Sequence, residues 1–191
     1  MKKCFLMGIF LMVLLLGGCT ASKDSALEKA VPSQTAEEAN ESNPFSGVDE
    51  IYMDVLSRYT ARGYALLDLD GNGTDELLIT DGEEIYELYG ICDDGQLHIM
   101  LERNRYIVEM KLCSDNRIFV HETDFNGCDY YSVLAMRTQV GNLPQELFVL
   151  CDGDSWWAGP YEKDAEPTTE EEARLLLDAI EFQQIEFIPF S

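Results

Sequence analysis

The chain is poor in positive charge and in histidine. It carries 13 lysines and arginines against 36 aspartates and glutamates, with two histidines, for a formal net charge of −23. Nucleic-acid affinity comes largely from basic side chains that neutralise phosphates, so this composition argues against a nucleic-acid partner. Charge alone would also keep the protein off an anionic membrane surface.

Common metal and nucleophile motifs are missing as well. No Cys-x-x-Cys occurs, and His98 and His121 are isolated in sequence, which excludes the usual zinc patterns. No nucleophile elbow or papain-like signature is present. With 36 acids, a carboxylate pair at glycosidase spacing carries almost no information. We therefore expect a protein that is not an enzyme, with both histidines structural or on the surface.

Long hydrophobic runs are limited to the start of the chain. Lys2 and Lys3 precede an apolar run from Phe5 to Leu16, which is too short for a comfortable membrane span. A basic start, a short apolar core and small residues before a cleavage point are typical of a secretory signal. The sequence Leu16-Gly17-Gly18-Cys19 resembles the bacterial lipoprotein box. The resemblance implies a signal peptide at 1–18, a lipidated Cys19 and a position on the outer face of the cytoplasmic membrane. The alternative is an ordinary signal peptide with a chance cysteine.

Residues 19–46 are predicted to be a tether. The segment after Cys19 is rich in Ala, Ser and Glu, and it has no aromatic residue before Phe45. It cannot bury enough apolar surface to offset the entropy of ordering, so a flexible coil reaching roughly 30 Å is expected. Residues 47–191 then form a single domain of ordinary size.

Two helices are predicted in this domain. Apolar residues recur at helical spacing from Val48 to Tyr59, and Gly63 is expected to close that helix. A second helix starts at Pro167-Thr168-Thr169, where Thr169 and Glu172 fit a capping box. Its apolar face is Ala173, Leu176, Leu177 and Ile180.

Short apolar and aromatic runs separated by turn residues predict strands between and after the helices. The runs are 64–67, 76–80, 84–91, 96–101, 106–113, 117–121, 129–136 and 145–151, with a short terminal strand at 185–190. Asp152-Gly153-Asp154-Ser155 is expected to end the series, leaving 156–160 irregular. The predicted fold class is α+β: a single antiparallel β-meander sheet with an N-terminal and a C-terminal helix.

Four cysteines belong to the predicted domain: Cys92, Cys113, Cys128 and Cys151. An even number in an exported domain favours disulfides. Counting strand ends along the meander favours the pair Cys128–Cys151, and then Cys92–Cys113. The alternative is four reduced thiols or a mixed state.

The stretch Tyr64–Thr80 predicts a calcium loop between two strands. Asp68, Asp70, Asn72, the Thr74 carbonyl and Glu76 supply oxygens at positions 1, 3, 5, 7 and 9, and Gly73 stands at position 6. Position 12 is Ile79, so the bidentate glutamate of an EF-hand is missing. The alternative is a glycine-rich hairpin whose aspartates accept backbone N–H bonds.

The loop resembles the D-x-D-x-N-G-x-x-E/D calcium loops of FG-GAP and VCBS repeats, where strands flank the ion. With its flanking segments Y-A-L-L-D-L-D-G-N-G-T-D-E-L-L-I, I-Y-E-L-Y, E-R-N-R-Y and I-E-F-I-P-F-S, the chain is similar to uncharacterised cell-surface lipoproteins of Firmicutes. The resemblance implies a cell-surface lipoprotein and no particular reaction. A single loop departs from the repeated loops of a propeller.

Three hypotheses follow from the sequence. The first is a lipid-anchored, monomeric extracytoplasmic protein with a structural calcium ion. The second is a module that binds wall glycans or a surface protein through Trp156 and Trp157, with Tyr161 close by. The third is a hydrolase that acts at the wall.

Overall fold

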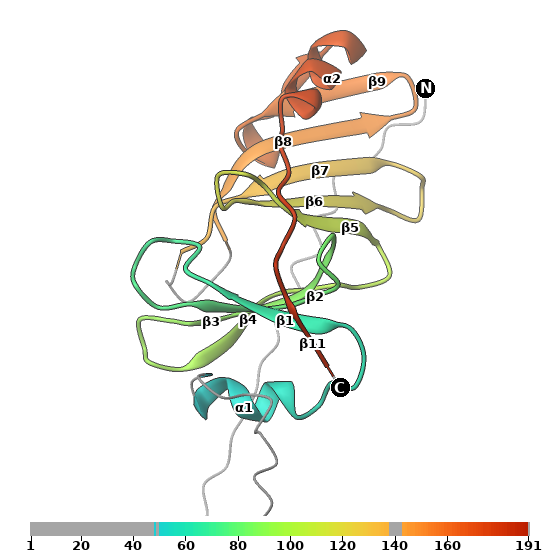
Figure 1. Cartoon of the computed structure of the whole chain (residues 1–191). Coiled ribbons are helices and arrows are strands. Elements are labelled where there is room, and N and C mark those ends of the chain that lie inside the picture. The colour runs from blue at the N-terminus through green and yellow to red at the C-terminus, as the bar shows by residue number, and fades with distance from the viewer. Residues whose placement is uncertain (1–47, 49, 138–142, 191) are drawn as a thin grey trace, which may run out of the picture. The chain divides into compact units, whose positions relative to one another are not determined.

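The computed structural model describes residues 48, 50–137 and 143–190. Among these residues the strands form two antiparallel sheets, one of five strands and one of six, accompanied by two α-helices (Figure 1). None of the described helices is long and apolar enough to cross a membrane. The predicted signal peptide, Cys19 and the tether lie outside the described residues.

Within each sheet, neighbouring strands follow one another along the chain, except that β11 lies beside β1. The five-stranded sheet runs β11 (Ile188–Pro189), β1 (Gly63–Leu67), β2 (Glu76–Thr80), β3 (Ile85–Ile91) and β4 (Leu97–Glu102). The six-stranded sheet runs β10 (Glu166–Thr168), β9 (Ser155–Gly159), β8 (Gln145–Asp152), β7 (Asp129–Leu134), β6 (Ile118–Thr123) and β5 (Ile107–Leu112). Strands β1 to β8 each lie within two residues of a predicted strand.

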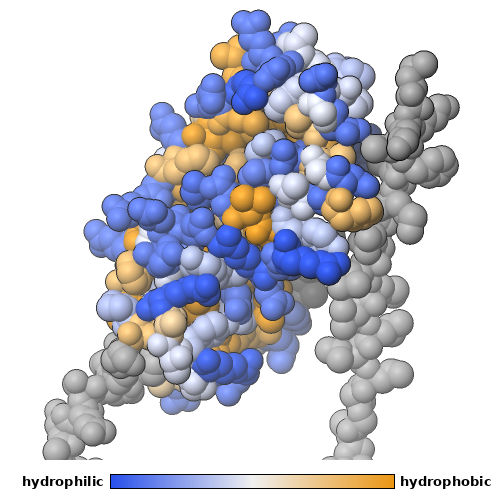
Figure 2. All heavy atoms as spheres, turned by 90° about the vertical axis from the view of Figure 1, so that its right-hand side faces the viewer, coloured by the Kyte–Doolittle hydropathy of each residue, from blue (hydrophilic) through white to orange (hydrophobic). Residues whose placement is uncertain are grey.

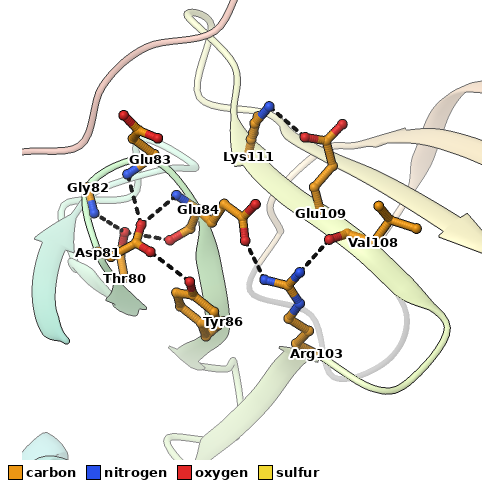
Figure 3. A network of polar contacts seen from close by, with 10 residues as sticks. All are labelled: Thr80, Asp81, Gly82, Glu83, Glu84, Tyr86, Arg103, Val108, Glu109 and Lys111. Carbon is orange, nitrogen blue, oxygen red and sulfur yellow. Dashed lines mark hydrogen bonds and ion pairs between the residues drawn. The ribbon is translucent and has the colours of Figure 1, made fainter. Parts of the chain in front are cut away.

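The prediction of a single sheet is wrong, because β5 pairs with β6 and not with β4. The bend after β4 leads into a second sheet. The residues of a bend do not show whether the next strand stays in the same sheet or starts a new one. Arg103, in this bend, donates to the Glu84 side chain and to the Val108 carbonyl oxygen. Figure 3 shows this bridge between the β2–β3 turn of one sheet and the first strand of the other.

Strand β2 is covered on both of its faces. All five of its residues are buried, and alternate side chains of a strand point to opposite faces. Leu78 joins the core that also contains Met110 and Ile118 of the six-stranded sheet. Leu77 joins a second core, beneath α1 (Glu50–Leu56). Strand β2 therefore lies between two cores, one shared with the second sheet and one shared with α1.

The second helix, α2 (Glu170–Asp178), packs on the six-stranded sheet. Ala173 is fully buried and contacts a cluster with Val149 and Trp156. The predicted capping box is confirmed: Thr169 Oγ1 accepts from the Glu172 N–H, and the Glu172 carboxylate accepts from the Thr169 N–H. Such a cap contributes about 1 kcal/mol.

The first helix is shorter than predicted. It ends at Leu56, and Gly63 opens β1 instead of closing the helix. A Cβ atom on Gly63 would lie 2.4 Å from the Ile188 carbonyl oxygen, so glycine permits the close approach of β11 to β1. The predicted stripe contains the buried residues Tyr52, Val55 and Leu56, while its other three members are partly buried, and the prediction of where the helix stops is wrong.

The segment 156–160 was predicted to be irregular, and this is also wrong. Asp152 pairs with Ser155 across a two-residue turn, and Gly153 has a φ of 60°. The turn residues are Gly153 and Asp154, and a glycine with positive φ at the first turn position suits a tight hairpin. Trp156 and Trp157 therefore lie within β9. Strand β10 and a short 3₁₀ turn, Glu162–Asp164, were not predicted.

After α2 the chain passes from one sheet to the other (Figure 1). The Gln183 N–H donates to the Leu112 carbonyl of β5, and the Ile185 N–H donates to the Gly82 carbonyl. Only Ile188–Pro189 of the predicted terminal strand is a strand. Figure 2 shows one face of the protein, mostly hydrophilic, with hydrophobic side chains in separate areas.

Candidate metal centre

The loop between β1 and β2 begins and ends at a paired residue. Leu67 pairs with Glu76 across the hairpin, so Asp68 to Asp75 form the loop itself. Gly71 and Gly73 have φ of 74° and 87°, and a Cβ atom added to either glycine would meet nothing within 4 Å. These left-handed positions let the chain fold back tightly enough to turn several carboxylates inward.

Three of the five predicted ligands come together. One carboxylate oxygen from each of Asp68, Asp70 and Glu76 lies within 4.8 Å of the other two. These carboxylates could hold a metal ion. Asp68 follows β1 and Glu76 opens β2, so the paired strand ends fix two of the three ligands.

Two of these carboxylates each accept one hydrogen bond from a backbone N–H. Asp68 Oδ2 accepts from the Gly73 N–H at 2.9 Å, and Glu76 Oε2 accepts from the Leu69 N–H at 2.8 Å. The second oxygens, Asp68 Oδ1 and Glu76 Oε1, are buried and have no hydrogen-bond donor among the described residues. Leaving a buried charged acceptor without a donor costs more than about 1–3 kcal/mol. A cation bound to Asp68 Oδ1 and Glu76 Oε1 would satisfy both oxygens.

Glu76 lies in the least water-accessible part of the site, with 0% of its surface exposed. The pKa of Glu76 is raised to about 7, chiefly by burial and also by the charges of Asp70, Asp68 and Asp75, while the hydrogen bond from the Leu69 N–H acts in the opposite direction. A bound cation would reverse this balance by favouring the ionised carboxylate.

The other two predicted ligands, Asn72 and Thr74, are exposed. Asn72 Oδ1 accepts from the Thr74 N–H at 2.6 Å, and Asp70 Oδ1 accepts from the Asn72 N–H at 3.1 Å. These bonds shape the turn. The roles of Asn72 and of the Thr74 carbonyl as ligands stay predictions.

Sequence reasoning missed the residue that joins this loop to α1. The Tyr52 hydroxyl donates to the Asp75 carbonyl oxygen at 2.7 Å. Tyr52 is 2% exposed and belongs to the core beneath α1. The helical stripe marked Tyr52 as a core residue, and no signal in the sequence indicated the loop as its partner.

The four cysteines of the described region are thiols that form no disulfide with one another. Cys151 pairs with Asp129, so these two side chains share one face, and Cys128, the residue before Asp129, points to the other face. Cys92 follows a strand of one sheet and Cys113 a strand of the other. Neither predicted disulfide is formed, because the register and the division into two sheets separate the partners. Burial raises the pKa of Cys151, and the charge of Asp129 adds to this, so the thiol stays protonated.

The two tryptophans do not share a surface. Trp156 is 8% exposed and packs under α2, with the Arg174 guanidinium 5.3 Å from its ring centroid. Trp157 follows it in β9 and therefore points to the opposite face of the sheet. Tyr161 is half-exposed, with Lys163 Nζ 5.6 Å from its ring centroid. The structure thus gives no joint Trp156–Trp157 contact surface.

Both histidines contact carboxylates. His98 Nε2 lies 3.0 Å from Asp94 Oδ2, and His121 Nε2 lies 3.0 Å from Asp129 Oδ1. The His121 ring also stacks on Tyr131, with centroids 4.4 Å apart. Neither histidine contacts the loop carboxylates.

Comparisons with protein-family models, curated proteins and solved structures found no match to this chain.

Proposed function

We propose that this protein is a lipid-anchored, non-enzymatic extracytoplasmic protein whose β1–β2 loop binds a calcium ion with a structural role. One observation carries the metal assignment: Asp68 and Glu76, whose carboxylates cluster with that of Asp70, each have a buried oxygen without a hydrogen-bond donor. All the candidate donors are oxygens, which favours a hard cation such as calcium.

The ion would act by mass action on folding. It would bind the paired strand ends of the native hairpin and not the unfolded chain, so it would stabilise the native state. At a free calcium concentration about 100 times the dissociation constant, the gain is about 2.7 kcal/mol. The contact between Tyr52 and Asp75 would extend this effect to α1.

Calcium titration with matched variants tests the proposal. Calcium should raise the free energy of unfolding of the wild type and release a measurable heat of binding. Glu76→Gln keeps an acceptor for the Leu69 N–H and removes the buried charge, so both effects should be lost. Asp75→Asn makes the same charge change on the exposed neighbouring side chain and should keep both. No binding at millimolar calcium, or equal loss in both variants, would overturn the metal assignment.

The anchor is tested separately. Support for it comes from Leu16-Gly17-Gly18-Cys19 and the apolar run before it. Cys19→Ala should release the protein into the medium or leave the signal peptide uncleaved, as seen by fractionation and mass measurement. Unchanged membrane retention of a processed Cys19→Ala protein would contradict lipidation.

A further inference from the structure

The metal loop contains an Asn-Gly pair, Asn72-Gly73, and the β6–β7 turn contains a second, Asn126-Gly127. Asparagine followed by glycine is the pair most prone to deamidation, because no side chain hinders attack of the next backbone nitrogen on the amide carbon. Asn72, Gly73, Asn126 and Gly127 are all exposed. The two pairs therefore differ in what surrounds the reacting atoms and not in access to water.

The attacking nitrogen of the first pair lies beside a base. The Gly73 N–H donates to Asp68 Oδ2 at 2.9 Å. In the second pair the Gly127 N–H donates to the Asp124 backbone carbonyl at 3.1 Å, which is a very weak base. Of the two pairs, the one in the metal loop thus offers the attacking nitrogen a carboxylate that can accept its proton.

The amide carbonyl of the first pair is also prepared for attack. Asn72 Oδ1 accepts from the Thr74 N–H at 2.6 Å, and this donor would stabilise negative charge that develops on the oxygen. Among the described residues, Asn126 Oδ1 has no such donor, and Asn126 Nδ2 instead donates to Asp124 Oδ2 at 3.3 Å. The described residues therefore combine the proton acceptor and the oxyanion donor at Asn72 and not at Asn126.

We propose that Asn72 is a self-modification site, at which the metal-free loop promotes its own deamidation. The Gly73 nitrogen attacks Asn72 Cγ while its proton passes to Asp68. The tetrahedral intermediate then expels Nδ2 as ammonia, which carries that proton away and leaves a succinimide. Water opens the ring, giving aspartate by attack at Cγ or isoaspartate by attack at the backbone carbonyl. The sum is the exchange of ammonia for water, with no oxidation or reduction.

The modification would alter the metal site itself. Aspartate at position 72 adds a carboxylate at the fifth position of the loop, whereas isoaspartate adds a backbone carbon to a tight turn. A cation bound by Asp68 would make its carboxylate a poorer proton acceptor for the Gly73 nitrogen, so a bound metal would slow deamidation of Asn72. This protection rests on the proposed function, while the modification does not.

Peptide mass mapping of the purified protein, incubated in a calcium-chelating buffer, tests the proposal. Asn72 should deamidate about tenfold or more faster than Asn126. In concentrated urea the two rates should become equal, because the folded geometry is lost. In chelating buffer Asp68→Asn should slow the reaction at Asn72, whereas Asp75→Asn should not.

Deamidation of Asn72 no faster than that of Asn126, or the same rate ratio in urea, would overturn the modification site. Added calcium should slow Asn72 and leave Asn126 unchanged. If calcium leaves a fast Asn72 reaction unaltered, the proposed metal centre fails while the modification site stands.

Discussion

Two acidic turns in this protein look alike in sequence and differ in chemistry. The β1–β2 loop reads D-L-D-G-N-G-T-D-E, and the β6–β7 turn reads D-F-N-G. In both, an aspartate accepts from the backbone N–H two residues later. At Asp124, however, Oδ1 accepts from the Asn126 and Cys128 N–H groups, and Oδ2 lies 3.3 Å from the Tyr130 hydroxyl.

The difference lies in burial and in which oxygens have donors. Partial burial raises the pKa of Asp124, but hydrogen bonds from Cys128 and Asn126 outweigh it and the net pKa is lowered. The pKa of Glu76 moves the other way, to about 7. The loop has buried carboxylate oxygens without donors, on Asp68 and Glu76, whereas both oxygens of Asp124 have donors, and this distinguishes the loop from the turn.

The largest expected contrast is in pH dependence. Without metal, the folded protein keeps a proton on Glu76 up to about pH 7, whereas the unfolded chain releases it near the ordinary pKa of 4.5. Stability should therefore fall as pH rises through this window, by up to about 3 kcal/mol. Urea unfolding across the window measures it.

Glu76→Gln is the control for this pH dependence, because its side chain does not titrate. In chelating buffer the wild type should lose stability relative to Glu76→Gln as pH rises from 4.5 to 7, because only the wild type has a carboxyl that ionises there. Calcium should stabilise the wild type and not the variant, so at pH 7 the wild type should become the more stable of the two. A difference that stays constant with pH would contradict the buried, metal-free carboxylate.

Asp124→Asn should give a smaller effect of a different kind. The asparagine keeps Oδ1 as the acceptor for the Asn126 and Cys128 N–H groups. Its Nδ2 cannot accept the Tyr130 hydroxyl as Asp124 Oδ2 does, so a loss of about 1 kcal/mol is expected. Because the Asp124 pKa is lowered, its stabilisation is present above pH 3.8 and is lost as pH falls through the lowered value. Chemical unfolding should show this loss to be equal with and without calcium. A loss that depends on calcium would break the distinction between the two turns.

The sequence was sufficient to predict local structure where one principle decided it. Strands β1 to β8 follow from apolar runs with turn residues between them, and the start of α2 follows from the Thr169–Glu172 pair. The division into two sheets could not be predicted, because the Asn104-Arg105 bend reads like any hairpin turn. The complete burial of β2 requires a core on each face of the strand. The sequence E-L-L-I-T alone does not show which elements pack on those faces, so this burial could not be predicted.

The candidate site was predictable in part for the same reason. Alternating oxygens predicted the cluster of Asp68, Asp70 and Glu76. Spacing could not show that Glu76 is the buried member, because its burial depends on the strands on either side of the loop. Disulfide pairing failed because it requires knowing which face each cysteine occupies, and a change of one residue in register reverses the face.

The central claim is a cation shared by Asp68, Asp70 and Glu76. A crystal structure of the protein grown with calcium tests it most directly. The account predicts an anomalous density peak between the three carboxylates, with oxygens at about 2.3–2.6 Å that include Asp68 Oδ1 and Glu76 Oε1. Ordered water hydrogen-bonded to both oxygens at that position, with no anomalous signal, would contradict it.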